Sequence, residues 1–350
     1  MVSSGEERAV QRGDGAAIPQ PTLSGTGRDT LARTKSPSYA LRAWRRFKRN
    51  RLSLVSMVIF LIMILFSYGA PLISKYVTKT GFSDQNLQAT FAPAGKTISA
   101  TQIGGPNSGQ TVTTKYILGA DELGRDVLTR LAYGGRISLT VSFLTLAIAL
   151  TVGLLIGALA GYYGGWVDTI LMRLVDVFIS IPGLFVLILV STTINNNKLI
   201  TGTGFYRTSG WLVLPFVIAI LSWTGISRLI RGEFLSLKSR DYVEAARVLG
   251  STDGRIIVRH ILPNVVPIII VWATLAVPGL ILTEAALSYL SFGVQIPTPS
   301  WGNMLTNSTQ YFSRSPGLVV LPGALIFITT MAVNLMGNGL RDALDPRLND

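Results

Sequence analysis

Long apolar stretches constrain the fold of this 350-residue chain more than any other feature of its sequence. A helix needs about 20 mostly apolar residues to cross a hydrocarbon core roughly 30 Å thick, because its backbone polar groups must be hydrogen-bonded within the segment. Stretches of that length predict an all-α integral membrane protein with about six transmembrane helices. They run over Leu52–Ile73, Ser138–Tyr162, Ile170–Ile194, Trp211–Ile230, Val265–Ala286 and Gly317–Met336.

Composition supports this class and argues against several others. Hydrophobic residues make up 49% of the chain and charged residues 14%. The net charge of +13 would suit nucleic-acid binding in a soluble domain, but here the cations flank apolar segments, which indicates membrane topology. The chain has no cysteine and a single histidine, His260, so we predict no metal site and no catalytic residues. Ala94–Thr97 resembles the end of a phosphate-binding loop, but Thr90 stands where that motif requires glycine.

The chain before the second apolar stretch divides into three parts. Residues 1–40 are rich in Gly, Ser, Thr, Arg and Pro, which predicts a disordered cytoplasmic tail. Residues 41–74 combine a basic lead with the first transmembrane helix. A secretory signal peptide is the alternative, but the apolar run is longer than a signal-peptide core and no clean cleavage site follows it. Residues 75–137 are polar and predict a small extracytoplasmic insert with short strands.

Lysine and arginine near the ends of the apolar stretches predict the orientation. Cations precede the first stretch, follow the fourth and recur in residues 341–350, and a six-helix arrangement places these three regions on one side. That side should be cytoplasmic, so both termini are expected in the cytoplasm of a multi-pass plasma-membrane protein. Residues 138–340 would form the core of five further helices.

Ionisable side chains within apolar stretches are candidate sites, because a charge inside a bilayer is costly. Arg173 and Asp176 are three residues apart and could form an intramembrane pair on one helix face, more simply to fix packing than to serve transport. Glu284 lies near the far end of the fifth stretch. Prolines inside the stretches, such as Pro182 and Pro278, predict bends.

One polar island, residues 240–263, separates the fourth and fifth stretches within a loop spanning residues 232–264. Helix-forming residues precede Gly250, and cap-type residues follow it, so the pattern predicts a helix, a glycine bend and a second short helix that ends at Pro263. In the second helix, Ile257 and Ile261 should share a face. The first helix should present one stripe, formed by Tyr242, Ala245, Ala246 and Leu249.

This island resembles the cytoplasmic EAA loop of ABC-importer permeases. The match rests on Glu244-Ala245-Ala246, then Gly250, then Ile261-Leu262-Pro263, although at strict register the aliphatic position of the family falls on His260. Further motifs of the dipeptide, oligopeptide and nickel branch follow the same order, and indicate its C-type permease subunit. These are Gly119–Asp126, Gly161–Asp168, Glu284–Gly293, Pro297–Gly302 and Gly339–Arg347, with Asn338 where the family usually has aspartate.

The resemblance implies a type I ABC-importer permease fold and a role as one of two permease subunits that form a pore for di- or oligopeptides. Two cytoplasmic ATPases, which carry ATP and magnesium, and an extracytoplasmic binding protein would be its partners. The chain itself would need no cofactor and would not be an enzyme. The residues that it implies for ATPase coupling are Tyr242, Glu244, Ala245, Ala246, Leu249, Gly250, Leu262 and Pro263. Import of nickel or another small solute, and a secondary transporter that works alone, are the alternatives.

Overall fold

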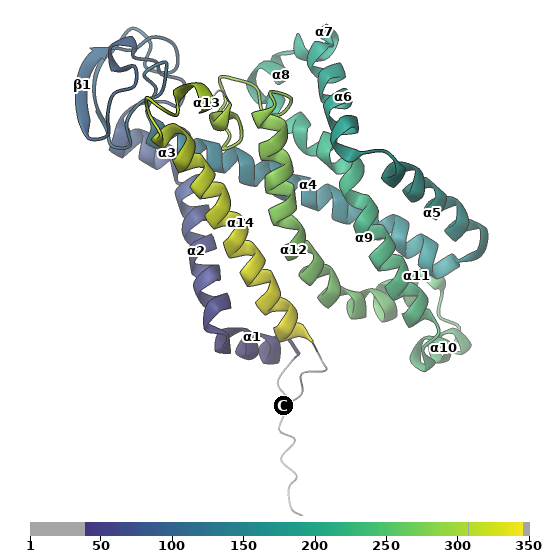
Figure 1. Cartoon of the computed structure of the whole chain (residues 1–350). Coiled ribbons are helices and arrows are strands. Elements are labelled where there is room, and N and C mark those ends of the chain that lie inside the picture. The colour runs from purple at the N-terminus through teal and green to yellow at the C-terminus, as the bar shows by residue number, and fades with distance from the viewer. Residues whose placement is uncertain (1–38, 307, 346–350) are drawn as a thin grey trace, which may run out of the picture. The chain divides into compact units, whose positions relative to one another are not determined.

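The computed structural model describes residues 39–306 and 308–345, and Figure 1 shows them as a bundle of long helices. Residues 1–38 of the predicted tail lie outside this part, and residues 39 and 40 already begin the first helix. The helices are α1 (Tyr39–Arg49), α2 (Arg51–Tyr68), α3 (Ala70–Leu72), α4 (Val127–Tyr163), α5 (Gly165–Ser180), α6 (Gly183–Asn196), α7 (Lys198–Thr201), α8 (Gly204–Ser209), α9 (Leu214–Lys238), α10 (Asp241–Val248), α11 (Asp253–Arg255), α12 (Leu262–Tyr289), α13 (Ser308–Tyr311) and α14 (Gly317–Leu344).

Five helical runs in the described part are long and apolar enough to cross a membrane. The pair α5 and α6 would be the sixth, and it is bent by 85° at the position where Pro182 predicted a bend. Ile181 is extended, with φ −96° and ψ 133°, because the ring of the following Pro182 disfavours helical backbone there. The predicted number of crossings is therefore confirmed only if this bent pair counts as one.

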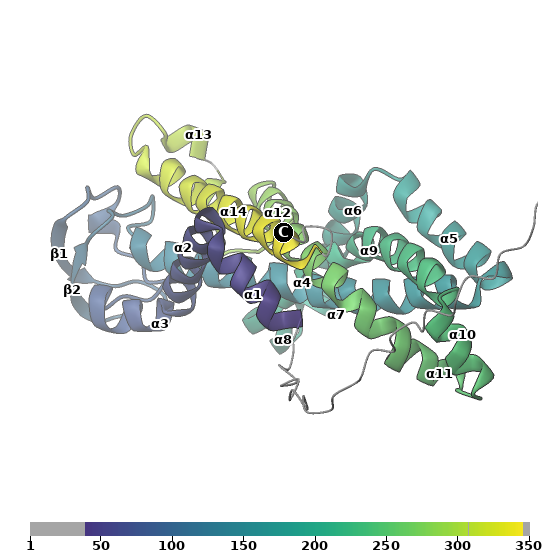
Figure 2. The same cartoon turned by 90° about the horizontal axis from the view of Figure 1, so that it is seen from below.

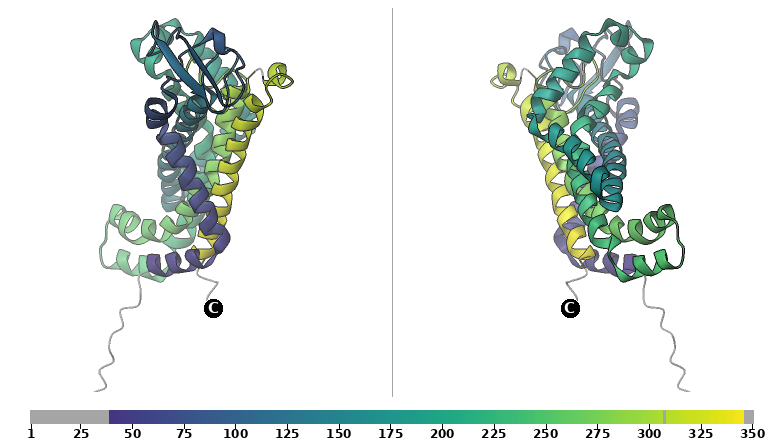
Figure 3. Two further views of the ribbon diagram at one scale, coloured as in Figure 1. Left: turned by 90° about the vertical axis from the view of Figure 1, so that its left-hand side faces the viewer. Right: turned by 90° about the vertical axis from the view of Figure 1, so that its right-hand side faces the viewer.

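The two ends of the bundle differ in what they carry. At one end, called the loop end, lie α1, α10 and α11 (Figure 3). Seen from that end, α1 lies beside α2 and α14, whereas α10 and α11 lie next to the end of α9 (Figure 2). At the opposite end, called the hairpin end, strands β1 (Lys96–Thr101) and β2 (Thr111–Tyr116) form an antiparallel hairpin. The predicted strands of the insert are thus present.

Helix α4 is the central element of the bundle and begins at Val127, well before the expected start near Ser138. Asp126 caps it, because its carboxylate accepts a hydrogen bond from the backbone N–H of Thr129 at 2.7 Å. Further along, Gly153, Gly157 and Gly161 recur at four-residue spacing and face α9. A Cβ on Gly157 would lie 2.8 Å from the Cβ of Ile230, so the small residues permit close contact between the two backbones.

The second helical segment of the polar loop (residues 232–264) runs directly into α12, without the predicted end at Pro263. Residues Ile256–Ile261 form a π-helical turn, and α12 follows directly, with Pro263 in its first turn. The prediction that Pro263 ends the second helix was therefore wrong. A proline ring clashes with the carbonyl four residues earlier, and the wider π turn just before it accommodates the ring.

Candidate functional site

Helix α10 presents a different face to the bundle from the one that its sequence pattern predicted. Val243 and Ala246 are its buried residues, and they lie three apart on one helical face. Val243 joins the apolar cluster around Phe234 of α9 and Ile261 of the π turn. Of the predicted stripe only Ala246 is buried, because α10 packs against the bundle through the face that carries Val243 and Ala246.

The remaining predicted residues of α10 are exposed. Tyr242, Glu244 and Ala245 face outward, and Leu249 is 85% exposed beside Val248, which is 88% exposed. Two adjacent aliphatic side chains so open to solvent are unusual at the end of a charged helix. They give the loop an apolar tip that nothing in the described chain covers.

Gly250 ends α10 in the left-handed region, with φ +78°, which a side chain rarely adopts. Its N–H donates to the carbonyl of Arg247 at 3.0 Å, and the N–H of Ser251 donates to the carbonyl of Ala246 at 3.0 Å. These bonds close the end of the helix. The predicted glycine bend is present, and it reverses the chain toward α11.

A tyrosine at the end of α4 fastens this loop to the bundle. The hydroxyl of Tyr162 donates to Asp253 Oδ1 at 2.6 Å, at the start of α11. Lys238 Nζ donates to the carbonyl of Tyr162 at 3.4 Å. The Tyr162 ring also belongs to the apolar cluster that contains Val243 and Phe234. The loop therefore rests on α4 as well as on the two helices that it connects.

The neighbouring residues of α5 bind α9 through two ion pairs. Arg231 binds both carboxylate oxygens of Asp168, with Nη2 donating to Oδ2 at 2.6 Å. Arg228 binds Asp176 at 2.6 Å. The predicted pair between Arg173 and Asp176 was therefore wrong, and Arg173 forms no ion pair within residues 39–306 and 308–345. Asp176 bonds across to another helix because the cation of α9 lies closer to its carboxylate.

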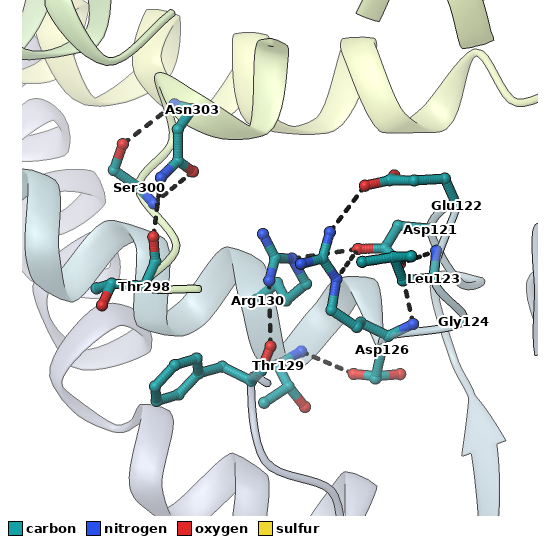
Figure 4. Close-up of polar contacts among 12 residues, drawn as sticks. Asp121, Glu122, Leu123, Gly124, Asp126, Thr129, Arg130, Thr298, Ser300 and Asn303 are labelled. Carbon is teal, nitrogen blue, oxygen red and sulfur yellow. Dashed lines mark hydrogen bonds and ion pairs between the residues drawn. The ribbon is translucent and has the colours of Figure 1, made fainter. Parts of the chain in front are cut away.

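The hairpin end holds a second polar cluster, which Figure 4 shows in the turn before α4. Asp121 Oδ2 accepts from Arg125 Nε at 2.6 Å and lies 3.3 Å from Arg130 Nε. Glu122 Oε1 accepts from Arg125 Nη2 at 2.8 Å. Burial raises the pKa of the Asp126 carboxyl, which has no ion-pair partner among the described residues.

Trp301 binds the segment after α12 to α4. Its ring is fully buried, its Nε1 donates to the carbonyl of Leu131 at 2.9 Å, and its backbone N–H donates to Ser138 Oγ at 3.2 Å. Nearby, the fully buried Glu284 accepts a hydrogen bond from Ser288 at 2.7 Å. Three motifs that are far apart in the sequence, Gly119–Asp126, Glu284–Gly293 and Pro297–Gly302, thus meet at one end of the bundle.

Sequence reasoning missed the residues that hold the polar loop in place and those that join the adjacent parts of α5 and α9. Val243, Tyr162, Asp253, Asp168 and Arg231 belong to this group. The signal was partly visible, since Tyr162 and Asp168 lie within the Gly161–Asp168 motif, but no local pattern indicates which distant side chain each one meets.

Fold and site together define a multi-pass membrane protein with a helical loop displayed at one end. Residues 153–350 match the family described as binding-protein-dependent transport system inner membrane component, and residues 38–93 match the N-terminal TM domain of oligopeptide transport permease C. The chain belongs to this family of inner membrane transport components.

Curated relatives align over most of the chain. The oligopeptide transport system permease protein OppC of Haemophilus influenzae is 36% identical over 87% of this chain and 88% of its own length. The dipeptide transport system permease protein DppC of Alkalihalophilus pseudofirmus is 34% identical over 87% and 89%. The glutathione transport system permease protein GsiD of Pectobacterium atrosepticum is 34% identical over 87% and 90%. Among solved structures, the MetNI methionine ABC transporter aligns with a TM-score of 0.48 and 19% identity, over 61% of this chain and 96% of that chain.

Proposed function

We propose that this chain forms half of the pore of an ATP-driven importer of di- or oligopeptides. The relatives that align over most of the chain are named for transport of oligopeptides, dipeptides and glutathione. A second permease would complete the pore. Two cytoplasmic ATPases would bind ATP and magnesium, and an extracytoplasmic binding protein would deliver the peptide.

The observation that carries the proposal is the construction of the polar loop. It is fixed to the bundle on one side, through Val243, Ala246 and the Tyr162–Asp253 hydrogen bond. On the other side it exposes Glu244 and the apolar tip of Val248 and Leu249. A loop that only connected two helices would gain nothing from exposed aliphatic residues, since their burial is favourable.

The same construction suggests how the loop would transmit motion. An ATPase groove that covers Val248 and Leu249 would push on α10, and Val243 would pass the displacement to Phe234 of α9. The Tyr162–Asp253 contact would carry it to α4 as well. ATP binding at the partner would then shift the population between inward-open and outward-open arrangements of the pore.

The test is ATP-dependent uptake by the importer reconstituted in vesicles with its partner subunits. Gly250→Pro and Glu244→Lys should leave the protein in the membrane but abolish uptake, because proline cannot adopt a φ of +78° and lysine reverses the charge offered to the ATPase. Gly254→Ala is the matched control, since a Cβ at Gly254 meets nothing within 4 Å and its φ is not positive. Normal uptake by both loop variants would refute the proposal.

The cargo is tested in the same vesicles with dipeptides, tripeptides, longer peptides and nickel. Uptake of one or more peptide classes, without uptake of nickel, is the expected result. Nickel uptake without peptide uptake would favour the alternative substrate and leave the coupling role of the loop intact.

A further inference from the structure

A cavity of about 390 Å³, lined by charged, polar and apolar residues, lies at the hairpin end of the bundle. The turn before α4 and the segment that follows α12 enclose it. Its lining includes Glu122, Arg125, Arg130, Ser291, Gln295 and Asn303. A volume of this size is in the range of small-ligand sites, and it would hold the last residue or two of a peptide.

Two buried guanidinium groups line this cavity, and each retains an unused donor. Arg130 is 4% exposed; its Nε faces Asp121 and its Nη1 donates to the carbonyl of Phe82. Arg125 is 7% exposed; its Nε and Nη2 bind Asp121 and Glu122. Within the described residues, Arg130 Nη2 and Arg125 Nη1 have no hydrogen-bond partner. In Figure 4, Arg130 lies between Asp121 and the segment that carries Asn303.

The two acids of the cluster are held differently. Asp121 is buried, and it accepts from the backbone N–H groups of Leu123 and Arg125 as well as from Arg125 Nε. Glu122 is 34% exposed and makes a single bond, to Arg125 Nη2. Glu122 can therefore turn toward solvent and release its arginine, whereas Asp121 is fixed. An incoming carboxylate could occupy the vacated position on Arg125.

We propose that this cavity binds the terminal carboxylate of a transported peptide, with Arg125 and Arg130 as donors and Glu122 as an internal competitor. The inference rests on the proposed peptide-import function and names the part of the cargo that this chain recognises. Arginine suits the role, because its planar fork bonds both oxygens of a carboxylate. Gln295 and Ser291 add polar groups for the neighbouring peptide bond.

The proposal predicts that substitutions of Glu122 and Arg125 change the KM for the free-acid peptide in opposite directions. Uptake kinetics are measured in the complete importer for one tripeptide as the free acid and as its C-terminal amide. Glu122→Gln should lower the KM for the free acid and leave that for the amide unchanged, because the competitor loses its charge. Arg125→Gln should raise the KM for the free acid about tenfold relative to the amide, the typical effect of losing a charge-assisted hydrogen bond. Any preference of the binding protein itself is common to all variants and cancels in the comparison.

Controls separate this role from a structural one. Arg125→Lys keeps the charge and should retain most of the preference for the free acid. Arg136→Gln removes an exposed cation from the same region of α4 and should change nothing. Glu122→Gln changes a partly exposed side chain with one bond, so it remains informative if Arg125→Gln fails to fold.

The outcomes distinguish the inference from the proposed function. A ratio of free-acid to amide KM that is the same in the wild type, Glu122→Gln and Arg125→Gln would overturn the carboxylate site while leaving peptide import intact. Loss of stimulation by the binding protein, without any change in that ratio, would also overturn it and assign the cavity to protein docking. A wild-type importer that takes up neither peptide form would refute the proposed function, and the inference with it.

Discussion

The loop end and the hairpin end of the bundle are both fixed by polar side chains, but in different ways. At the loop end the tying residues, such as Asp168 and Arg231, are partly exposed and bind one partner each. At the hairpin end Asp121, Arg130 and Trp301 are buried; Asp121 binds both Arg125 and Arg130, and Trp301 bonds to Leu131 and Ser138 of α4. The loop end therefore resembles a movable attachment, whereas the hairpin end resembles a packed core.

This difference is consistent with the roles proposed for the two ends, which are ATPase coupling at the loop end and ligand binding at the hairpin end. A loop that receives motion must keep its contacts while a partner docks on its outer side. An end whose cavity is lined by buried arginines must hold those charged groups in place, which requires several hydrogen bonds for each group. Substitutions should therefore affect stability at the hairpin end and coupling at the loop end.

The largest effect on stability is expected from Trp301→Ala at the hairpin end. The substitution removes a fully buried ring together with its bond to Leu131, and changes of this kind cost about 3–5 kcal/mol. Thermal unfolding in detergent should show the loss as a lower Tm. Trp166→Ala is the control, since Trp166 is 82% exposed in α5. Equal Tm values for the two variants would contradict the packed-core description.

A smaller loss of stability is expected from Arg231→Glu, because the substitution places a second carboxylate beside Asp168 at the loop end. The pair with Asp168 is partly exposed, so the cost in stability should be about 2 kcal/mol, between the values for surface and buried pairs. Uptake per ATP hydrolysed should fall more strongly than Tm. The double variant Asp168→Arg with Arg231→Glu should restore both, and its failure would indicate that charge pairing is not what matters there.

Tyr162→Phe should cost less again, about 1 kcal/mol, because it removes one hydroxyl and keeps the ring in its apolar cluster. If Tyr162 takes part in coupling, ATP hydrolysis by the importer should continue in Tyr162→Phe while peptide uptake falls. Tyr163→Phe is the control, since the neighbouring ring is exposed. Unchanged uptake in Tyr162→Phe would mean that α4 does not carry motion from the loop.

The smallest effect is expected from Asp126→Asn, and it should depend on pH. Burial raises the pKa of this carboxyl, so its ionised form destabilises the fold, and that penalty grows as pH rises from about 4 through the raised pKa. Asparagine can cap α4 equally well and carries no charge. The variant should therefore be slightly more stable than the wild type at neutral pH and indistinguishable at acid pH. A stability difference between Asp126→Asn and the wild type that increased as the pH was lowered would contradict this prediction.

Much of the fold could be predicted because the apolar stretches are long and the Gly250 bend has a local cause. The expectations that failed depended on tertiary partners. The bend that Pro182 predicted is present, with an angle of 85° between α5 and α6, whereas the helix that continues through Pro263 was not expected. Asp176 found Arg228 on another helix in preference to Arg173 on its own.

The candidate site divides in the same way. The sequence located the polar loop and its glycine, since composition and spacing are local properties. It could not indicate that Val243 anchors α10 or that Tyr162 reaches Asp253, because these contacts join residues on different helices. The motifs around Asp121 and Trp301 were recognised separately, and only the fold showed that they meet.

Site-specific crosslinking tests the central claim, that the exposed tip of the polar loop docks on an ATPase, most directly. The chain contains no cysteine, so a single Leu249→Cys substitution can carry a photoreactive label without further changes. Leu87→Cys, exposed at the hairpin end, provides the control. In the assembled importer, the label at position 249 should crosslink to an ATPase subunit and the label at position 87 should not. A label at position 249 that crosslinks only to lipid, while ATP-driven uptake continues, would contradict the claim.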